Sequence, residues 1–493
     1  MMQRSWLIPR VRAAVTAAVL GAALVACATP PRHDSPPQAP VADSSLGLTG
    51  EAVSPATTTW WQSFHDGQLD ELIGQALQTN PGLAEADSRL REAQAQVAVA
   101  RSGQWPRANL SAGETRLKIP SGFPPALAAG QSVWAGDLGA TLSWDLDLWG
   151  KHADVTAQAR ALNDAARLDV EQARLLLTGA VVQSYIDLHR AYALADIAQR
   201  AEAQRGTILD ITRKRVAAGL DTRVELREAE GALPQARVET LQAQSAQSLA
   251  AHQLAALLGR GADQYAGIRR PTLDLSAALP LPEALPINLL RSRPDVIAAR
   301  ARIDAADAQK RAAKAAFYPD ISLKALAGYA SFSLDDLIGA SSFGYGVGPA
   351  LSLPLFDAGR LRAQYQGTEA QLDEAVASYD DIVVHAVHEA ADQLTQIDAL
   401  TRQIEQQQQS LAAAEDAYRL AEERYRAGLA DYLIVLNAET EVLHQRQQQV
   451  DLNSSLALAR VTLLLAVGGS FQNSADPTVA ALLPARSSIK ARP

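Results

Sequence analysis

The sequence has few of the residues on which several common protein classes depend. Its 493 residues include one cysteine, which excludes a disulfide framework, an iron–sulfur cluster and a cysteine-rich zinc site. Aromatic residues make up only 5% of the chain although 48% is hydrophobic, and much of the apolar share is alanine. Alanine builds helices but fills a core poorly, so this composition suits long, closely packed helices. The formal charge of −9 provides no basic field for nucleic acid.

Proline is missing from two long stretches, between residues 125 and 234 and between residues 354 and 477. Within them we predict two single helices, Lys151 to Ala218 and Arg360 to Ala427, each of 68 residues. At ~1.5 Å per residue such a helix is about 100 Å long. Heptad packing of an antiparallel helical hairpin is predicted by two series, one stepping by four and three and one by seven. They are Leu400, Ile404, Gln407, Leu411, Ala414, Tyr418, Ala421 and Tyr425, then Leu429, Leu436, Leu443, Val450, Ala457 and Leu464.

The chain repeats itself once, with an offset of 213 residues that changes to 209 further along. The matching pairs are Asn80-Pro81 with Arg293-Pro294, Trp105-Pro106 with Tyr318-Pro319, Gly150-Lys151 with Gly359-Arg360, and Ala218-Gly219-Leu220 with Ala427-Gly428-Leu429. Each copy reads helix, two strands, very long helix, helix. We therefore expect a first structural repeat at 59–260, a linker at 261–286, a second repeat at 287–469 and a C-terminal tail at 470–493.

Residues of alternating polarity predict strands at 134–148 and 343–355, with hairpin partners at 109–118 and 321–331. A soluble sandwich edge would show similar alternation, but strands of about 10–15 residues can also cross a membrane at a tilt. The residues expected to face the membrane are Trp134, Leu138, Leu142, Trp144, Phe343, Tyr345, Val347 and Leu351. An open four-stranded sheet would leave backbone groups unsatisfied in lipid. A closed barrel of at least about eight strands, and hence two or more chains, is therefore required.

The N-terminal segment has the layout of a secretory signal, with Arg4, Arg10 and Arg12 ahead of a short apolar run. The run ends in Leu24-Val25-Ala26-Cys27, which looks like a bacterial lipobox. We predict a lipoprotein signal peptide at 1–26, acylation (including palmitate) at Cys27, and a proline- and serine-rich tether at 27–58. An ordinary signal with an incidental cysteine is the alternative. Ala28, in place of an acid, favours delivery to the outer membrane.

Several motifs together resemble the TolC-like outer-membrane factors of tripartite efflux pumps, in their lipoprotein branch. The resemblance covers nearly the whole chain after the signal and rests on Trp60-Trp61-Gln62-Ser63-Phe64-His65-Asp66, Leu69 to Leu83 with its Asn80-Pro81, Arg291-Ser292-Arg293-Pro294-Asp295, Phe317-Tyr318-Pro319, Leu353-Pro354-Leu355-Phe356-Asp357-Ala358-Gly359-Arg360 and Arg424-Tyr425-Arg426-Ala427-Gly428-Leu429. It implies a mixed, mostly α fold with a duplicated β-hairpin and long helical hairpin. It further implies a homotrimer that forms a 12-stranded β-barrel and a 12-helix tunnel projecting into the periplasm.

The resemblance also implies partners and a function. The partners are a periplasmic adaptor, an inner-membrane pump of the resistance-nodulation-division type and outer-membrane lipid, and the function is a passive exit duct for small molecules in multidrug resistance. A duct for type I protein secretion is an alternative, and so is a coiled-coil lipoprotein without a pore.

In this family the periplasmic tip is narrowed by charged and tyrosine side chains. Gly219 and Gly428 fall where the long helices turn back, Glu225 at the place of a gating acid in some members, and Tyr425 at the tip tyrosine. Ala430 stands where some members have arginine, and the other charges available are Asp221, Arg223 and Asp431. Both a gate and a solvated turn account for these charges.

No catalytic site is expected, because no nucleophile motif accompanies the serine, histidine and aspartate residues. His385, His388 and Glu389 have a spacing that a metal could use, but the polar face of a coiled coil carries such residues routinely. We therefore expect neither an enzyme, nor a metal site, nor a cofactor.

Overall fold

The computed structural model describes residues 40–41, 46, 48, 59–122, 130–276, 279, 281, 284–285, 293–333 and 335–469. The predicted signal peptide, Cys27 and the C-terminal tail lie outside the described residues. The chain forms two compact units, and each unit takes segments from both repeats. Of the described residues, one includes those in 90–165 and 299–379, and the other includes those in 59–89, 166–298 and 380–469.

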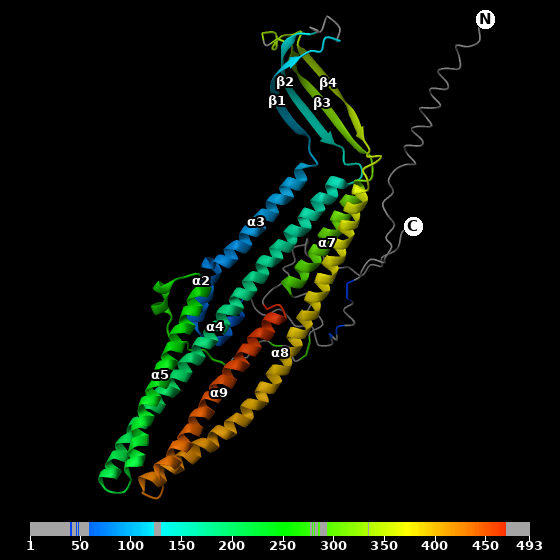
Figure 1. Ribbon diagram of the computed structural model, residues 1–493. Helices are drawn as coiled ribbons and strands as arrows, with labels where there is room; N and C mark the ends of the chain where they lie inside the picture. Colours follow the sequence, from blue (N-terminus) through cyan, green and yellow to red (C-terminus); the bar gives the residue numbers. More distant parts are fainter. Residues whose placement is uncertain are drawn as a thin grey trace, which may run out of the picture. The chain divides into compact units, whose positions relative to one another are not determined.

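The duplication is visible in the order and length of the elements (Figure 1). The first copy has α3 (Pro81–Ser102), β1 (Arg107–Lys118), β2 (Ser132–Asp145), α4 (Lys151–Ala217) and α5 (Arg223–Leu257). The second has α7 (Pro294–Ala315), β3 (Asp320–Ser331), β4 (Phe343–Ser352), α8 (Arg360–Arg426) and α9 (Tyr432–Ala466). The short elements η2 (Trp60–Phe64) and α2 (Gly67–Thr79) precede the first copy, and η4 (Ala262–Gly267) follows it.

Matched helices of the two copies have equal lengths. The long helices α4 and α8 have 67 residues each, and α5 and α9 have 35 each. The prediction of two single long helices is therefore confirmed to within one residue at their ends. Strand β4, with 10 residues, is shorter than β2, with 14. No helix in the described part of the chain is both long enough and apolar enough to cross a membrane.

The four strands form one antiparallel sheet in the order β1-β2-β3-β4 (Figure 1). Its register places Leu142 opposite Ala325, which is opposite Val347, and Leu138 opposite Tyr329, which is opposite Phe343. Residues directly opposite each other in a sheet lie on the same face. The apolar series of β2 and of β4 therefore share one face, which carries exposed large apolar side chains.

The strands end three residues earlier than predicted, at Asp145 and Ser352 rather than at 148 and 355. The residues that follow form capping turns instead. Asp147 has a φ of 44° and accepts hydrogen bonds from the backbone N–H groups of His152 (2.8 Å) and Ala153 (2.9 Å) at the start of α4. Asp357 accepts from the N–H of Leu361 at the start of α8 (2.9 Å). An aspartate that caps a helix start in this way ends the extended chain.

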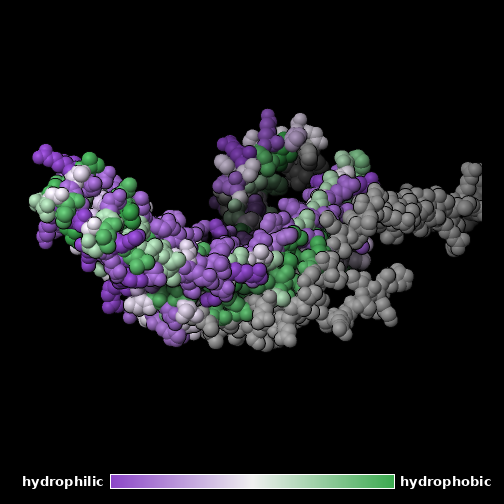
Figure 2. Space-filling model, turned by 90° about the horizontal axis from the view of Figure 1, so that it is seen from below, coloured by the Kyte–Doolittle hydropathy of each residue, from purple (hydrophilic) through white to green (hydrophobic). Residues whose placement is uncertain are grey.

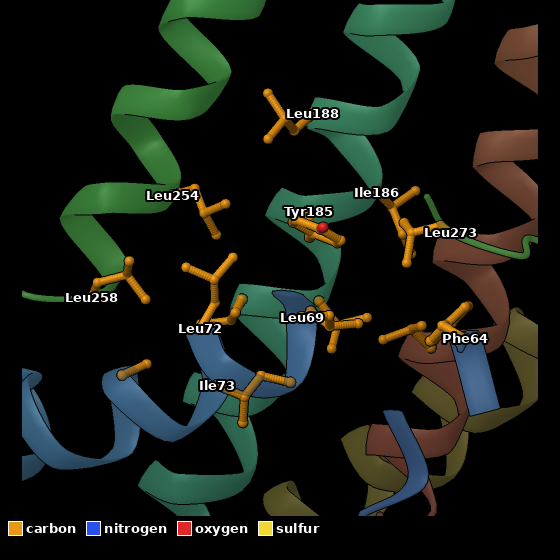
Figure 3. Close-up of a cluster of buried hydrophobic side chains, with 14 of the residues drawn as sticks. Phe64, Leu69, Leu72, Ile73, Tyr185, Ile186, Leu188, Leu254, Leu258 and Leu273 are labelled. Carbon is orange, nitrogen blue, oxygen red and sulfur yellow. The ribbon is translucent and has the colours of Figure 1, made fainter. Parts of the chain in front are cut away.

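A cluster of buried apolar side chains joins η2 and α2 to α4, α5 and the segment after η4 (Figure 3). It includes Phe64, Leu69, Leu72, Ile73, Tyr185, Ile186, Leu188, Leu254, Leu258 and Leu273. A polar contact fixes its edge: the carboxylate of Asp66 accepts from Tyr185 Oη (2.9 Å) and from the Thr272 backbone N–H (2.7 Å). These hydrogen bonds lower the pKa of Asp66 although its burial acts in the opposite direction.

The heptad prediction is right for α8 and partly wrong for α9. Five of the eight predicted α8 positions are buried and the other three are half-buried, as a continuous seam requires. Leu429, however, is 76% exposed, because it lies in the turn before α9 begins. The buried seam of α9 starts instead at Tyr432 and continues through Val435, Glu439 and Val442. It alternates steps of three and four, and the predicted Leu436 and Leu443 lie beside it.

Candidate functional site

The candidate site is the pair of turns that join α4 to α5 and α8 to α9 (Figure 1). Both turns have the same backbone. Gly219 and Gly428 have φ angles of 73° and 75°, a conformation that glycine adopts without strain. The N–H of Leu220 donates to the Arg215 carbonyl (2.9 Å), and the N–H of Leu429 donates to the Arg424 carbonyl (2.8 Å). This is the Schellman geometry, which satisfies the last carbonyls of each long helix.

Side chains from both turns meet in one polar network around Arg215 of α4. Its Nε and Nη2 donate to the two carboxylate oxygens of Asp221, both at 2.9 Å, in a bidentate pair. Its Nη1 donates to the backbone carbonyl of Tyr425, also at 2.9 Å, at the end of α8. The guanidinium carbon lies 4.5 Å from the centroid of the Tyr425 ring. One arginine therefore ties the α4–α5 turn to the α8–α9 turn.

The Tyr425 hydroxyl completes this network. It donates to Asp221 Oδ2 (2.9 Å) and lies 2.9 Å from Thr212 Oγ1 of α4. Hydrogen bonding by Arg215 holds the pKa of Asp221 below its usual value, so the pair is ionised at neutral pH. Burial raises the pKa of Tyr425, which keeps its hydroxyl protonated and able to donate. Each polar side-chain atom of the network thus has a partner of the right kind.

An apolar cluster lies next to the network, on the side of the four helices. Ile208, Leu209, Ala229, Ala421, Tyr425, Tyr432 and Val435 form a buried cluster to which all four helices of the two hairpins contribute. The rings of Tyr425 and Tyr432 are 6.3 Å apart. Around the turns themselves, five large apolar side chains remain about half exposed or more: Leu220, Val224, Leu429, Leu433 and Ile434. On the face seen from below, apolar residues lie in groups between polar ones (Figure 2).

Two of the other predicted tip charges, Glu225 and Asp431, bind the backbone of their own helices. The carboxylate of Glu225 accepts from the backbone N–H of Thr222 (2.9 Å), which forms a capping box at the start of α5. Asp431 caps α9 by accepting from the N–H of Ile434 (3.1 Å). Arg223 is exposed. Of the predicted gate candidates, the structure thus brings only Asp221 and Tyr425 into one network.

Sequence reasoning missed Arg215, Thr212 and a second link, in which Arg205 of α4 lies 3.6 Å from Glu439 of α9. A signal for them exists in the repeat itself. At the offset of 209 residues, Arg205 corresponds to Ala414 and Thr212 to Ala421, so both polar residues occur in one repeat only. At such positions one repeat has a polar side chain that can make a contact which the alanine of the other repeat cannot make.

The predicted membrane-facing residues lie together on one face of the sheet, as the register shows. Trp134, Leu142, Trp144, Phe343, Tyr345, Val347 and Leu351 are between 38% and 80% exposed, and Leu138 is half-buried. Arg116 lies over the Trp134 ring at 5.5 Å, and the rings of Tyr329 and Phe343 are 5.4 Å apart. Exposed apolar side chains gathered on one face are typical of a surface that contacts a membrane or a protein partner.

His385 and Glu389 of α8, which the sequence analysis considered as possible metal ligands, contact other side chains. The Nδ1 of His385 lies 3.3 Å from Asp381, and the Glu389 carboxylate accepts from Arg293 Nη1 (2.8 Å). Among the described residues, no three histidine, cysteine or acidic side chains come together in a way that could hold a metal ion.

The model of the outer membrane efflux protein family matches residues 72–260 and 285–469. The chain belongs to this family. The fusaric acid resistance protein FusA of Burkholderia cepacia is 36% identical over 375 residues, which cover 73% of this chain and 70% of FusA. The outer membrane protein OprJ of Pseudomonas aeruginosa is 30% identical over 462 residues, 93% of this chain and 96% of OprJ.

Solved structures agree with the sequence comparison. The outer membrane protein VceC of Vibrio cholerae has a TM-score of 0.79 at 34% identity, and the match covers 85% of this chain and 100% of VceC. The family membership and the mostly α fold with a small antiparallel sheet, both inferred from the motifs, are thereby confirmed.

Proposed function

We propose that the chain is the outer-membrane exit channel of a tripartite efflux pump and serves as a passive duct for small molecules. The observation that carries this proposal is the sheet at one end of two 67-residue helices. It has one exposed apolar face, and its outer strands β1 and β4 are each paired on one side only within the described chain. Relatives named as efflux and resistance proteins support small molecules as cargo.

The two open sheet edges support a homotrimer. Unpaired N–H and C=O groups are costly in lipid, so edges within a membrane must be closed by neighbouring strands. Three chains would supply twelve strands for a barrel and would bring their long helices together as a tunnel in the periplasm. A periplasmic adaptor and an inner-membrane pump of the resistance-nodulation-division type would then join the tunnel to its source of energy.

The Arg215 network is the proposed gate. It ties the two turns of each subunit together at the narrow end of the tunnel, through hydrogen bonds from Arg215 and Asp221 of one turn to Tyr425 of the other. Release of the network would leave the apolar cluster of the four helices as the remaining contact between the hairpins, and packed helices of this kind can shift against one another without unfolding. Asp221 and Tyr425 are its predicted members, and Glu225, Arg223 and Asp431 take part through the shape of the turns.

Cys27 is the proposed lipid anchor. Acyl chains contribute about 0.8 kcal/mol per buried methylene group, which supports insertion without replacing the barrel. With the signal retained, Cys27→Ser should therefore still reach the outer membrane, with less protein inserted.

The central experiment is reconstitution of the purified protein into planar bilayers. A trimer that conducts ions is the expected result, and a cysteine placed at Leu142 or Leu351 should react with a lipid-restricted probe. A protein that remains monomeric and non-conducting, with both cysteines unreactive toward that probe, would contradict the channel and favour a non-pore spacer. Export of a large polypeptide alongside an ABC transporter, with no change in drug susceptibility, would favour protein secretion.

A further inference from the structure

A buried carboxylate lies inside the helix bundle, apart from the Arg215 network. Glu439 of α9 is 2% exposed, and within the described part of the chain neither of its carboxylate oxygens has a hydrogen-bond partner. The nearest opposite charge is Nε of Arg205 on α4, at 3.6 Å from Oε2, which is too far for a hydrogen bond. Arg205 instead directs Nη1 to the backbone carbonyl of Ala232 on α5, at 3.4 Å.

Every helix packed against Glu439 contributes a titratable or charged group. Arg205 of α4 favours its ionised form, whereas Glu239 of α5 opposes it. Tyr418 of α8 and Tyr432 of α9 are near enough for the Glu439 charge to raise their own pKa values, that of Tyr432 to about 12 after the larger effect of burial. Burial outweighs the attraction of Arg205, so the pKa of Glu439 is raised above its usual value.

An ionised carboxylate without hydrogen bonds is costly in a dry site, and the cost disappears when water reaches it. In the packed arrangement, α4 and α9 keep water from Glu439. A movement that separates the two hairpins would hydrate its carboxylate and lower its pKa toward that of a free side chain. The packed arrangement therefore binds a proton more tightly than the separated one.

From this geometry we infer that Glu439 is a proton-binding site whose occupancy stabilises the packed, closed arrangement of the two hairpins. The inference rests on the proposed channel function and adds a regulating ligand, the proton, to its gate. Because the packed state has the higher pKa, the stabilisation is fully present below the ordinary value of 4.5 and is lost as the pH rises through the raised value. Acid therefore favours closure, and neutral or basic pH favours opening.

Single-channel conductance of the full-length protein at pH 5 to 8 tests this coupling. In the wild type, the open fraction should increase at least about threefold over this range. Glu439→Gln resembles the protonated side chain, so its channels should stay closed at every pH. Glu230→Gln is the matched control, because Glu230 holds the same position in the first repeat but is half exposed and paired with Arg227 at 2.7 Å. It should retain the wild-type pH dependence.

Thermal unfolding of the same proteins in detergent provides a readout that needs no channel. The unfolding midpoint of the wild type should fall from pH 5 to pH 8 more steeply than that of Glu439→Gln. Arg205→Met, which removes the opposing cation, should move the transition to higher pH and covers the case in which Glu439→Gln does not fold. Equal pH slopes in the wild type and Glu439→Gln would overturn the inference. Pores that never conduct would contradict the channel function alone, and the unfolding slopes would still decide the role of Glu439.

Discussion

Two arginines of α4 that reach the second hairpin differ in how completely their polar contacts are satisfied. Near the turns, Arg215 makes a bidentate pair with Asp221 and a hydrogen bond to Tyr425. About three helical turns away, Arg205 faces Glu439 at 3.6 Å, and the facing atoms have no hydrogen bonds among the described residues. In the Arg215 pair, well-aligned hydrogen bonds offset the free energy that burial of the charges costs. In the Arg205–Glu439 pair, where such hydrogen bonds are missing among the described residues, much of that cost remains.

The two links should therefore differ in how they respond to pH. A satisfied ion pair with a lowered carboxylate pKa holds over the whole physiological pH range, so protons do not release it. An unsatisfied carboxylate with a raised pKa responds to protons. Mutations that act on one link and spare the other test whether the roles are separate.

Arg215→Ala should have the largest effect. It leaves Asp221 partly buried without its cation and removes the contact with Tyr425, which together should lower the free energy of unfolding by about 3 kcal/mol. Single-channel conductance should rise, because the contacts of Arg215 with the carbonyl and ring of Tyr425 join the two turns and are lost. Bilayer recordings and thermal unfolding measure both effects.

Arg424→Ala is the matched control, since Arg424 holds the same position in the second repeat and its side chain is exposed. It should leave conductance and stability close to those of the wild type. If both variants raise the conductance equally, the channel is kept closed by positive charge at the turns and not by the Arg215 network.

The extent to which the sequence predicts this site follows from the physics of each feature. The repeat, the long helices and the strands depend on local patterns, so they were predicted almost to the residue. The strand ends were missed because Asp147 and Asp357 cap helices, a role that alternation of polarity does not reveal. The apolar face of the sheet was predicted because a period of two places alternate residues together.

The Arg215 network could not be predicted in the same way, because its members are up to 213 residues apart. Asp221 was predicted from its charge at the turn, and Tyr425 from its position in the family pattern. Neither observation predicts that Arg215 lies between them. Glu225 and Asp431 attract attention for their charge, yet each satisfies the backbone of its own helix. Comparing the two repeats for positions of unlike polarity would have revealed Arg205 and Thr212.

Asp221→Asn should have the second largest effect, and its pH dependence distinguishes the two links. Because the folded-state pKa of Asp221 lies below the ordinary 3.8, its stabilisation is present above that value and is lost only as the pH falls through the lowered pKa. The variant should lose about 2 kcal/mol at pH 7 while its pH slope between 5 and 8 stays that of the wild type. Unfolding midpoints at several pH values measure this, and a flattened slope would assign the pH response to Asp221 instead of Glu439.

Tyr425→Phe should have a smaller effect. The substitution removes the hydroxyl bonded to Asp221 and close to Thr212, but it keeps the ring beneath Arg215 and the backbone carbonyl that Arg215 binds. A loss of about 1.5 kcal/mol and a modest rise in conductance are expected. An effect as large as that of Arg215→Ala would show that the Tyr425 hydroxyl, rather than the contacts of Arg215 with the Tyr425 carbonyl and ring, holds the turns together.

The smallest effect is expected from the helix caps. Thr222 and Asp431 are the N-cap residues of α5 and α9 at corresponding positions of the two repeats. Replacing either by alanine should cost about 1 kcal/mol, because one backbone N–H near the helix start loses its acceptor. Conductance should change little, since neither side chain belongs to the Arg215 network, and the same holds for Glu225→Ala. Recordings of Asp431→Ala combined with Glu225→Ala provide the strictest test: a conductance as high as that of Arg215→Ala would mean that these acids pair across subunits and form the gate themselves.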